Sequence, residues 1–259
     1  MDFERPCRYD GVVVAHLRDE WIRRTGPAYP VFVAYRLQSR LPLAVELQPS
    51  AEDVHRARPW LLLVGLGIGA LAGGVATVFG NYGGTPAAAA VAIVLSFLLS
   101  AGYFEVGLAR SVEGAGRWFL KEDDRAVSYL SGPAALIISF FLPFAALLSL
   151  PSDQWLGVLV CAHLVARWSC LLADLSVDWR RDIQLGNPPR WMSFAIASVI
   201  GAGVVVSLGG ANGFLAVLLA GVLALVASAG IRKEPELRES LVAASGCIAG
   251  IATYLCFCF

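Results

Sequence analysis

The chain has 259 residues, of which 57% are hydrophobic and 15% charged, and its formal net charge is zero. A soluble domain carries about 25% charged residues, so this composition excludes an ordinary soluble protein and favours a membrane protein. The chain has neither an acidic nor a basic tail, and no run of cations indicates a nucleic-acid partner.

The first part of the chain is polar. Residues 1–28 carry no recognisable motif and no continuous apolar segment typical of a cleavable signal peptide, so we interpret them as an N-terminal extension. The stretch Tyr29–Val45 is apolar but interrupted by Arg36 and Arg40, which predicts a helix lying in the membrane interface. We therefore divide the chain into the extension, 1–28, and a single transmembrane domain, 29–259.

Seven apolar stretches follow, and a span needs about 20 apolar residues. They are Trp60–Phe79, Thr85–Phe104, Pro133–Leu150, Gln154–Ala173, Trp191–Leu208, Asn212–Ile231 and Leu241–Phe259. The sequence predicts an all-α, polytopic helical bundle in the lipid bilayer, with about seven transmembrane helices plus the N-terminal interfacial helix. Glycines in the first span, from Gly65 to Gly74, are expected to let helices pack closely.

The cations are distributed unevenly between the two sides of this bundle. Every Lys and Arg except Arg167 lies in segments 1–59, 105–132, 174–190 or 231–241, whereas the connections near 81–84, 151–154 and 209–212 contain none. Because short cytoplasmic segments carry the Lys/Arg excess, we predict a multi-pass protein of the inner (plasma) membrane. Its N-terminus would be cytoplasmic and, after an odd number of spans, its C-terminus outside.

One charge, Arg167, lies inside a predicted span. An intramembrane arginine indicates a functional site. The alternative is an arginine that snorkels, because the cytoplasmic end of the span is only about two turns away. His163, one turn from Arg167, is expected to be a satisfied interior histidine. The six cysteines form no C-x-x-C pair, so we expect free thiols and no zinc site.

Several segments resemble the motifs of one family of membrane enzymes. Ser39-Arg40-Leu41-Pro42 resembles the motif T-R-L-P, and Trp60–Gly69 resembles F-P-L-V-G-x-x-x-G. Gly102–Gly114 resembles G-x-H-x-D-G-x-x-D-x-x-D-G, and Ser128–Leu136 resembles D-x-R-x-G-x-x-G-x-x-A-L. Arg167 stands where the family has an S-R pair on a later helix. From about Tyr29 to its end, the chain thus resembles the cobalamin synthases (adenosylcobinamide-GDP ribazoletransferases). The resemblance implies a polytopic inner-membrane enzyme that joins a ribazole to a GDP-activated corrinoid and releases GMP.

The chain departs from this family at the acidic signature. The three Asp positions are occupied by Val106, Arg110 and Glu113, and the His position by Phe104. Residues at i, i+4 and i+7 share one helix face, where three carboxylates could hold the Mg²⁺ that the resemblance implies. Because these ligands are largely lost, we expect no metal site and no confidently assigned cofactor. We predict instead that Arg110 and Glu113, three residues apart, form a contact.

Three functional hypotheses remain, and whether the chain is an active enzyme stays open. The first is a divergent transferase that holds a phosphorylated or nucleotide-linked small molecule with arginine in place of metal. The second is a catalytically inactive relative that scaffolds or partners another membrane protein. A homo-oligomer is a separate prediction about partners. The third is a small transporter, although the sequence shows no repeat.

For the transferase, we place the site in a cytoplasmic cavity lined by segments 105–132, 174–190 and 231–241. The candidate catalytic residues are Glu105, Arg110 and Glu113, and the candidate substrate-binding residues are Arg40, Arg117, Asp123, Asp124, Arg167 and Asn187.

Overall fold

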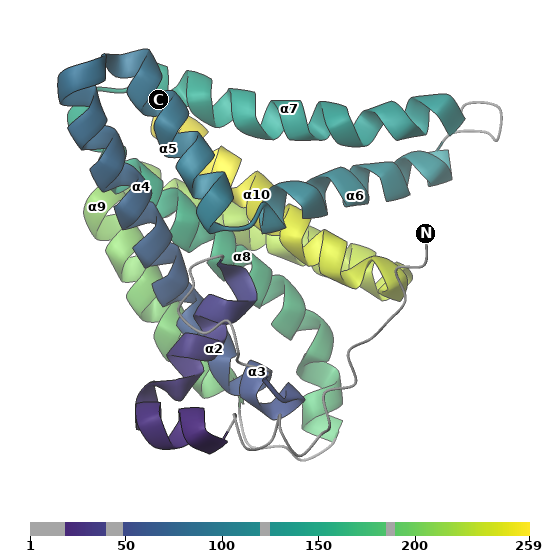
Figure 1. Cartoon of the computed structure of the whole chain (residues 1–259). Helices are drawn as coiled ribbons and strands as arrows, with labels where there is room; N and C mark the ends of the chain where they lie inside the picture. Colours follow the sequence, from purple (N-terminus) through teal and green to yellow (C-terminus); the bar gives the residue numbers. More distant parts are fainter. Residues whose placement is uncertain (1–18, 40–48, 120–124, 185–189) are drawn as a thin grey trace, which may run out of the picture.

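The computed structural model describes residues 19–39, 49–119, 125–184 and 190–259, and every regular element in these ranges is helical (Figure 1). After a helical stretch at 19–25, the helices are α2 (Tyr29–Gln38), α3 (Ala51–Ala57), α4 (Leu61–Gly83), α5 (Thr85–Leu99), α6 (Tyr103–Phe119), α7 (Arg125–Ser149), α8 (Trp155–Gln184), α9 (Arg190–Lys233) and α10 (Arg238–Cys256). Short 3-10 helices occupy Gly26–Ala28, Arg58–Trp60, Ser152–Gln154 and Pro235–Leu237. The all-α fold class is confirmed.

Five helical segments are long and apolar enough to cross a membrane, or six if one bent pair counts as a span. The five lie at 58–80, 130–149, 152–177, 194–233 and 235–256. They confirm a polytopic membrane bundle, and they include every region where hydropathy predicts a span except 85–104.

The predicted span Thr85–Phe104 is not one straight helix. Helix α5 ends at Leu99, and α6 leaves it at an angle of 80°. Two successive residues with positive φ, Ala101 at 59° and Gly102 at 65°, make the turn. The 15 residues of α5 extend only about 22 Å, less than the ~30 Å hydrocarbon core. Hydropathy averaged along the chain does not detect such a turn, because the residues on both sides of it are apolar.

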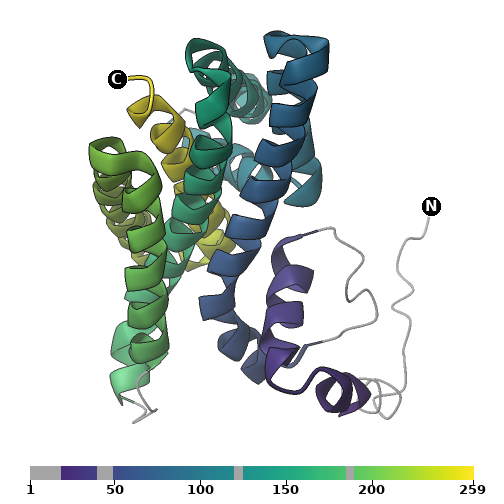
Figure 2. The same ribbon diagram turned by 90° about the vertical axis from the view of Figure 1, so that its left-hand side faces the viewer.

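Helix α9 is broken at Gly210, where φ is 55° and ψ is −130°. A Cβ atom at Gly213 would lie 2.3 Å from the carbonyl oxygen of Val205, although residues eight apart in a straight helix are separated by about 12 Å. The chain therefore folds back on itself at Gly210, as Figure 2 shows at the upper end of the green helix. The two arms correspond to the predicted spans Trp191–Leu208 and Asn212–Ile231.

Helix α8 runs through the centre of the body, between α4, α9 and α10. Gly65, Gly69 and Gly73 recur every four residues on one face of α4, and a Cβ at any of them would come within 2.9 Å of backbone atoms of α8. This close approach confirms the packing role predicted for these glycines.

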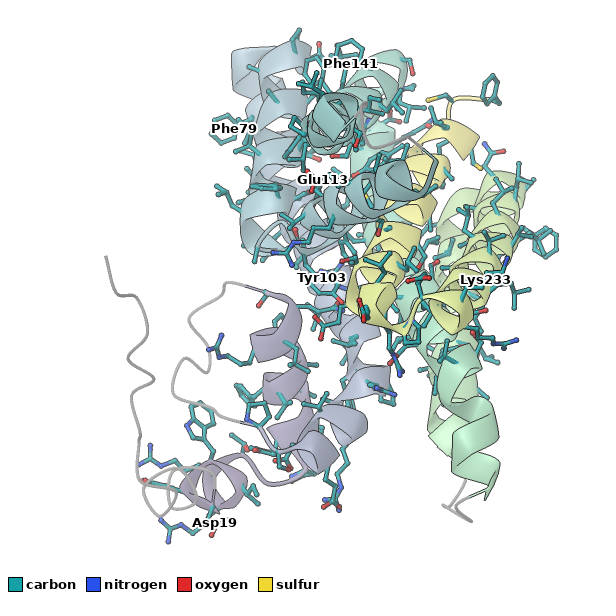
Figure 3. The ribbon with its side chains drawn as sticks, turned by 90° about the vertical axis from the view of Figure 1, so that its right-hand side faces the viewer. Asp19, Phe79, Tyr103, Glu113, Phe141 and Lys233 are labelled. Carbon is teal, nitrogen blue, oxygen red and sulfur yellow. The ribbon has the colours of Figure 1, made fainter. Side chains whose placement is uncertain are left out.

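Helix α2 covers the outer side of α4. Its residues Tyr29, Val33 and Ala34 are buried in a core cluster together with Val64 and Ile68 of α4. The predicted interfacial helix is therefore a helix packed on the bundle as far as Gln38, and the rest of the predicted stretch, to Val45, lies outside the described residues. Figure 3 shows Asp19 near the lower end of the molecule and Phe79 and Phe141 toward its upper end, with Tyr103, Glu113 and Lys233 between them.

Candidate functional site

Arg167 is completely buried on α8, with 0% of its surface exposed. Its guanidinium carbon lies 5.1 Å from the centroid of the Phe104 ring on α6, which is within the range of a cation–π interaction. Its Nη1 lies 3.4 Å from Nδ1 of His163 and donates to the carbonyl oxygen of His163 at 3.3 Å. The snorkelling alternative is therefore wrong, because the guanidinium does not reach the protein surface.

His163 connects Arg167 to α5. Its Nε2 lies 3.0 Å from Oγ of Ser96. If Nδ1 accepts from Arg167, then Nε2 carries the hydrogen and donates to Ser96, which is the neutral tautomer. The prediction of a satisfied interior histidine is confirmed. His163 also holds one edge of the Arg167 guanidinium through its contacts with Nη1.

Three buried polar atoms of this region have no hydrogen-bond partner in the described part of the chain. They are Nε and Nη2 of Arg167 and Oε2 of Glu105. Glu105 and Arg167 are electrostatic neighbours on adjacent helices, but they form no ion pair within 4.0 Å in the described residues. Buried polar groups are nearly always paired, and unpaired charged groups inside a membrane protein mark functional sites.

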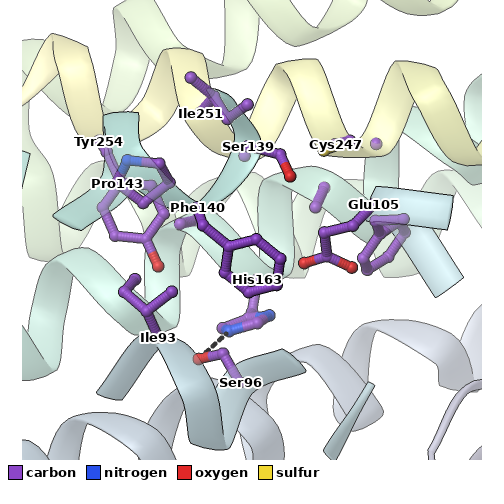
Figure 4. Close-up of a pocket in the computed structure, with 15 residues that line it drawn as sticks. Ile93, Ser96, Glu105, Ser139, Phe140, Pro143, His163, Cys247, Ile251 and Tyr254 are labelled. Carbon is purple, nitrogen blue, oxygen red and sulfur yellow. Dashed lines mark hydrogen bonds between the residues drawn. The ribbon is translucent and has the colours of Figure 1, made fainter. Parts of the chain in front are cut away.

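A cavity of about 50 Å³ lies beside Glu105 (Figure 4). Its polar lining comes from Glu105, His163, Ser96, Ser139 and Tyr254, and Figure 4 shows the Glu105 carboxylate directed toward His163. The rest of the wall is mainly apolar and includes Ile93, Phe104, Phe140, Pro143 and Ile251. The volume is enough for a few water molecules, but it does not accommodate a nucleotide.

Segments far apart in the sequence converge on Arg167. Gly65 of α4 makes room for it, since a Cβ there would lie 2.9 Å from Cδ of Arg167. Phe104 and Glu105 approach from the start of α6, and Tyr35 of α2 is a further electrostatic neighbour. Helix α2 leads directly into the motif-like segment at residues 39–42. Helices α4 and α6 carry the motif-like segments at residues 60–69 and 102–114.

The structure separates the other candidates on α6 from this cluster. Arg110 is exposed, and no ion pair joins it to Glu113 within the described residues. Glu113 packs against α7, where a Cβ at Gly132 would lie 2.1 Å from Oε1 of Glu113. The predicted Arg110–Glu113 contact is therefore wrong: Arg110 points outward and Glu113 toward α7.

The remaining candidates cannot be placed. Arg40, Asp123, Asp124 and Asn187 lie outside the described residues, and Arg117 is on α6 in a part where side chains are not described. Their substrate-binding roles stay predictions.

Sequence reasoning missed a charged cluster centred on Asp174. Its Oδ2 lies 2.8 Å from Nη2 of Arg58, and its Oδ1 accepts from Nε of Arg238 at 3.1 Å and also from Nη2 of Arg238. The cluster joins the 3-10 helix that precedes α4, the C-terminal half of α8 and the first residue of α10. The sequence shows that the acidic Asp174 directly follows a predicted span. It does not show that Arg58 and Arg238 are the partners of Asp174.

The three segments predicted to form a common cavity contact one another in pairs among the described residues. Arg238 and Asp174 join two of them, and Leu237 contacts Gly114 of the third. Large parts of segments 105–132 and 174–190 lie outside the described side chains, so the shared cavity stays a prediction.

The acidic-signature positions do not fit a magnesium ion. Val106 offers no donor, Arg110 is a cation, and a single carboxylate such as Glu113 is a weak ligand for Mg²⁺, which gives up its water reluctantly. Within the described ranges, no three His, Cys, Asp or Glu side chains are grouped closely enough to hold a metal ion. Asp123 and Asp124 are not among those residues.

Comparison with known proteins identifies the family. The model of the cobalamin-5-phosphate synthase family matches residues 30–257. An adenosylcobinamide-GDP ribazoletransferase of Pseudomonas fluorescens is 32% identical over 212 residues, which cover 75% of this chain and 84% of that protein. One from a Roseiflexus species is 27% identical over 202 residues, with 75% of each chain covered.

A third relative, from Shewanella pealeana, is 29% identical over 147 residues, and the match spans about half of each protein, 52% of this chain and 56% of the relative. No solved structure matches the chain. Because the family match extends over all the helices from α2 to α10, this multi-pass membrane protein belongs to the cobalamin synthase family.

Proposed function

We propose that this chain is a membrane-embedded transferase that acts on a nucleotide-activated substrate. The reaction would be the one named for its relatives, the transfer of a ribazole to a GDP-activated corrinoid with release of GMP. We place the protein in the inner membrane with a cytoplasmic N-terminus, and we place the reaction at its cytoplasmic face.

The observation that carries this proposal is the convergence of α4, α6 and α8 on the buried Arg167. A family match alone would also fit a protein that has lost its reaction. A buried guanidinium with two donors that no described residue satisfies, next to the segments that resemble the family motifs, supports a retained ligand site. A protein that only scaffolds a partner would not need a buried guanidinium, because an apolar side chain of similar size would be less costly to bury.

Complementation tests the proposal. The chain is expressed in a bacterial strain that lacks its own ribazoletransferase and that needs cobalamin for growth. We expect the wild-type chain and the Arg24→Ala variant, altered at an exposed position, to restore growth, and the Arg167→Met variant to fail at equal membrane abundance. Failure of the wild-type chain, with the protein present and folded, would refute the assignment.

A further inference from the structure

Arg167 offers one edge of its guanidinium to a ligand. Nη1 is engaged by His163, whereas Nε and Nη2, which lie together on the other edge, are buried and have no hydrogen-bond partner among the described residues. The same edge is in use elsewhere in this protein, where Nε and Nη2 of Arg238 both donate to Asp174. Two parallel N–H donors match two oxygens of a phosphate group or a carboxylate.

The position of this edge is fixed before any ligand arrives. His163 holds Nη1 from within α8, the Phe104 ring lies against the guanidinium, and Gly65 leaves just enough room for Cδ of Arg167. A pre-organised donor pair at a buried position stabilises negative charge far more than the same pair does in bulk water. The arrangement is therefore suited to an oxyanion.

Glu105 supplies the complementary group. Its Oε2 is a buried acceptor without a partner in the described part of the chain, and it belongs to the residue next to Phe104. A ligand that satisfies both side chains presents anionic oxygens to Arg167 and a hydroxyl hydrogen to Glu105. A phosphate approached by a hydroxyl nucleophile has this pattern, whereas a carboxylate ligand alone would leave Glu105 unpaired.

We infer that Arg167 and Glu105 form a phosphoryl-transfer site in which the guanidinium edge binds the phosphate and Glu105 accepts the proton of the attacking hydroxyl. The inference rests on the proposed function and specifies its chemistry. The hydroxyl oxygen forms a bond to the corrinoid-side phosphorus, and the bond from that phosphorus to the bridging oxygen of the diphosphate breaks. The electron pair of that bond leaves with GMP, and the hydroxyl proton moves to Oε2 of Glu105.

The cavity beside Glu105 provides surroundings for that proton. The other ionisable side chains that line it are His163 of α8 and Cys247 and Tyr254 of α10, while Ser96 and Ser139 add hydroxyl groups. Water molecules in this space could accept the proton from Glu105 after each transfer. Because Arg167 has no exposed surface, a ligand reaches it only when a neighbouring helix moves, so association should be slower than for an open site.

Binding of GDP, a probe for the nucleotide diphosphate, tests the role of Arg167. The full chain is purified in lipid nanodiscs, and calorimetry is carried out with excess EDTA. We expect the wild-type protein to bind and the Arg167→Lys variant, which keeps the charge but loses the two-donor edge, to bind about tenfold or more weakly, as loss of a charge-assisted hydrogen bond implies. The matched Arg24→Lys variant, at an exposed arginine that pairs with Glu20, should bind like wild type. Equal binding by Arg167→Lys, or loss of wild-type binding in EDTA, would overturn the inference.

Glu105→Gln tests the proton transfer and keeps the inference testable if Arg167→Lys does not fold. This variant should bind GDP at least as well as wild type, because a negative charge is removed from beside the phosphate, while turnover falls about 100-fold or more, the usual contribution of a general base. Unchanged turnover would refute the role of Glu105. GDP binding that depends on Arg167 without any ribazole transfer would contradict the proposed function alone, and transfer that does not depend on Arg167 would contradict this inference alone.

Discussion

Arg167 of α8 and Phe104 of α6 lie in contact inside the helical body, with the guanidinium carbon 5.1 Å from the ring centroid. In the family motif that α6 resembles, the position of Phe104 is a histidine. An aromatic ring stabilises a buried guanidinium, and a protonated or metal-bound imidazole would not. The change at Phe104 is therefore consistent with a site centred on an arginine.

Gly65 should be intolerant of any side chain. A Cβ there would lie 2.7 Å from the carbonyl oxygen of His163 and 2.9 Å from Cδ of Arg167, so Gly65→Ala should lower the free energy of unfolding by about 1–3 kcal/mol. Gly74→Ala is the matched control on the same helix, because nothing lies within 4 Å of its Cβ, and it should be neutral or stabilising. Thermal unfolding in detergent compares the two. Equal stability of both variants would contradict the close packing of α4 on α8.

Glycine should be required at position 210 because of its backbone conformation and not because space is lacking for a side chain. Its φ is 55° and nothing lies within 4 Å of a Cβ at this position, so Gly210→Ala should cost about 1–3 kcal/mol through strain and not through a clash. Gly203→Ala, in the same helix and equally open, should not destabilise. If Gly210→Ala unfolds at the wild-type temperature, the two arms of α9 are not joined by this strained turn.

The orientation in the membrane can be measured directly. Cysteines are placed at Gly83 and Lys121 in a variant without other cysteines, and intact cells are treated with a membrane-impermeant maleimide. The cation distribution predicts that the cysteine at 83 is labelled and the cysteine at 121 is not. Labelling at position 121 would reverse the predicted orientation.

The predicted homo-oligomer or membrane-protein partner stays a prediction.

Metal affinity should appear only when the acidic signature is rebuilt. Val106→Asp and Arg110→Asp together with Glu113 provide three carboxylates at positions i, i+4 and i+7 of α6. Glu113, whose side chain points toward α7, would turn to join the two new carboxylates around Mg²⁺, which relieves their repulsion. We expect calorimetry to detect Mg²⁺ binding to the double variant and not to the wild-type protein. Wild-type binding of Mg²⁺ that is lost in Glu113→Gln would show that the ordinary metal site of the family persists.

The parts of this structure that depend on local composition could be predicted from the sequence. The apolar stretches predicted the helical body, and the glycines from Gly65 to Gly74 predicted a close helix contact. The turn at Ala101–Gly102 was not predicted, because a positive φ at an alanine leaves no trace in hydropathy.

The site was only partly predictable for a different reason. Arg167 and Glu105 were each identified from the sequence, but their proximity depends on how α6 and α8 pack. Asp174 and Arg238 are 64 residues apart, so no periodicity connects them. The prediction of an Arg110–Glu113 contact was wrong, because the spacing of two residues on a helix does not determine whether both side chains turn toward each other.

The most direct test of the central claim is transfer by the purified chain itself. Wild-type protein in proteoliposomes is given a ribazole and the GDP-activated corrinoid, and mass spectrometry follows GMP and the joined corrinoid product. The account predicts that GMP and the joined product form with Arg24→Lys, a variant at an exposed arginine, as they do with wild-type protein, and that neither forms above background with Arg167→Lys. Absence of both products with folded wild-type protein, or their undiminished formation by Arg167→Lys, would contradict it.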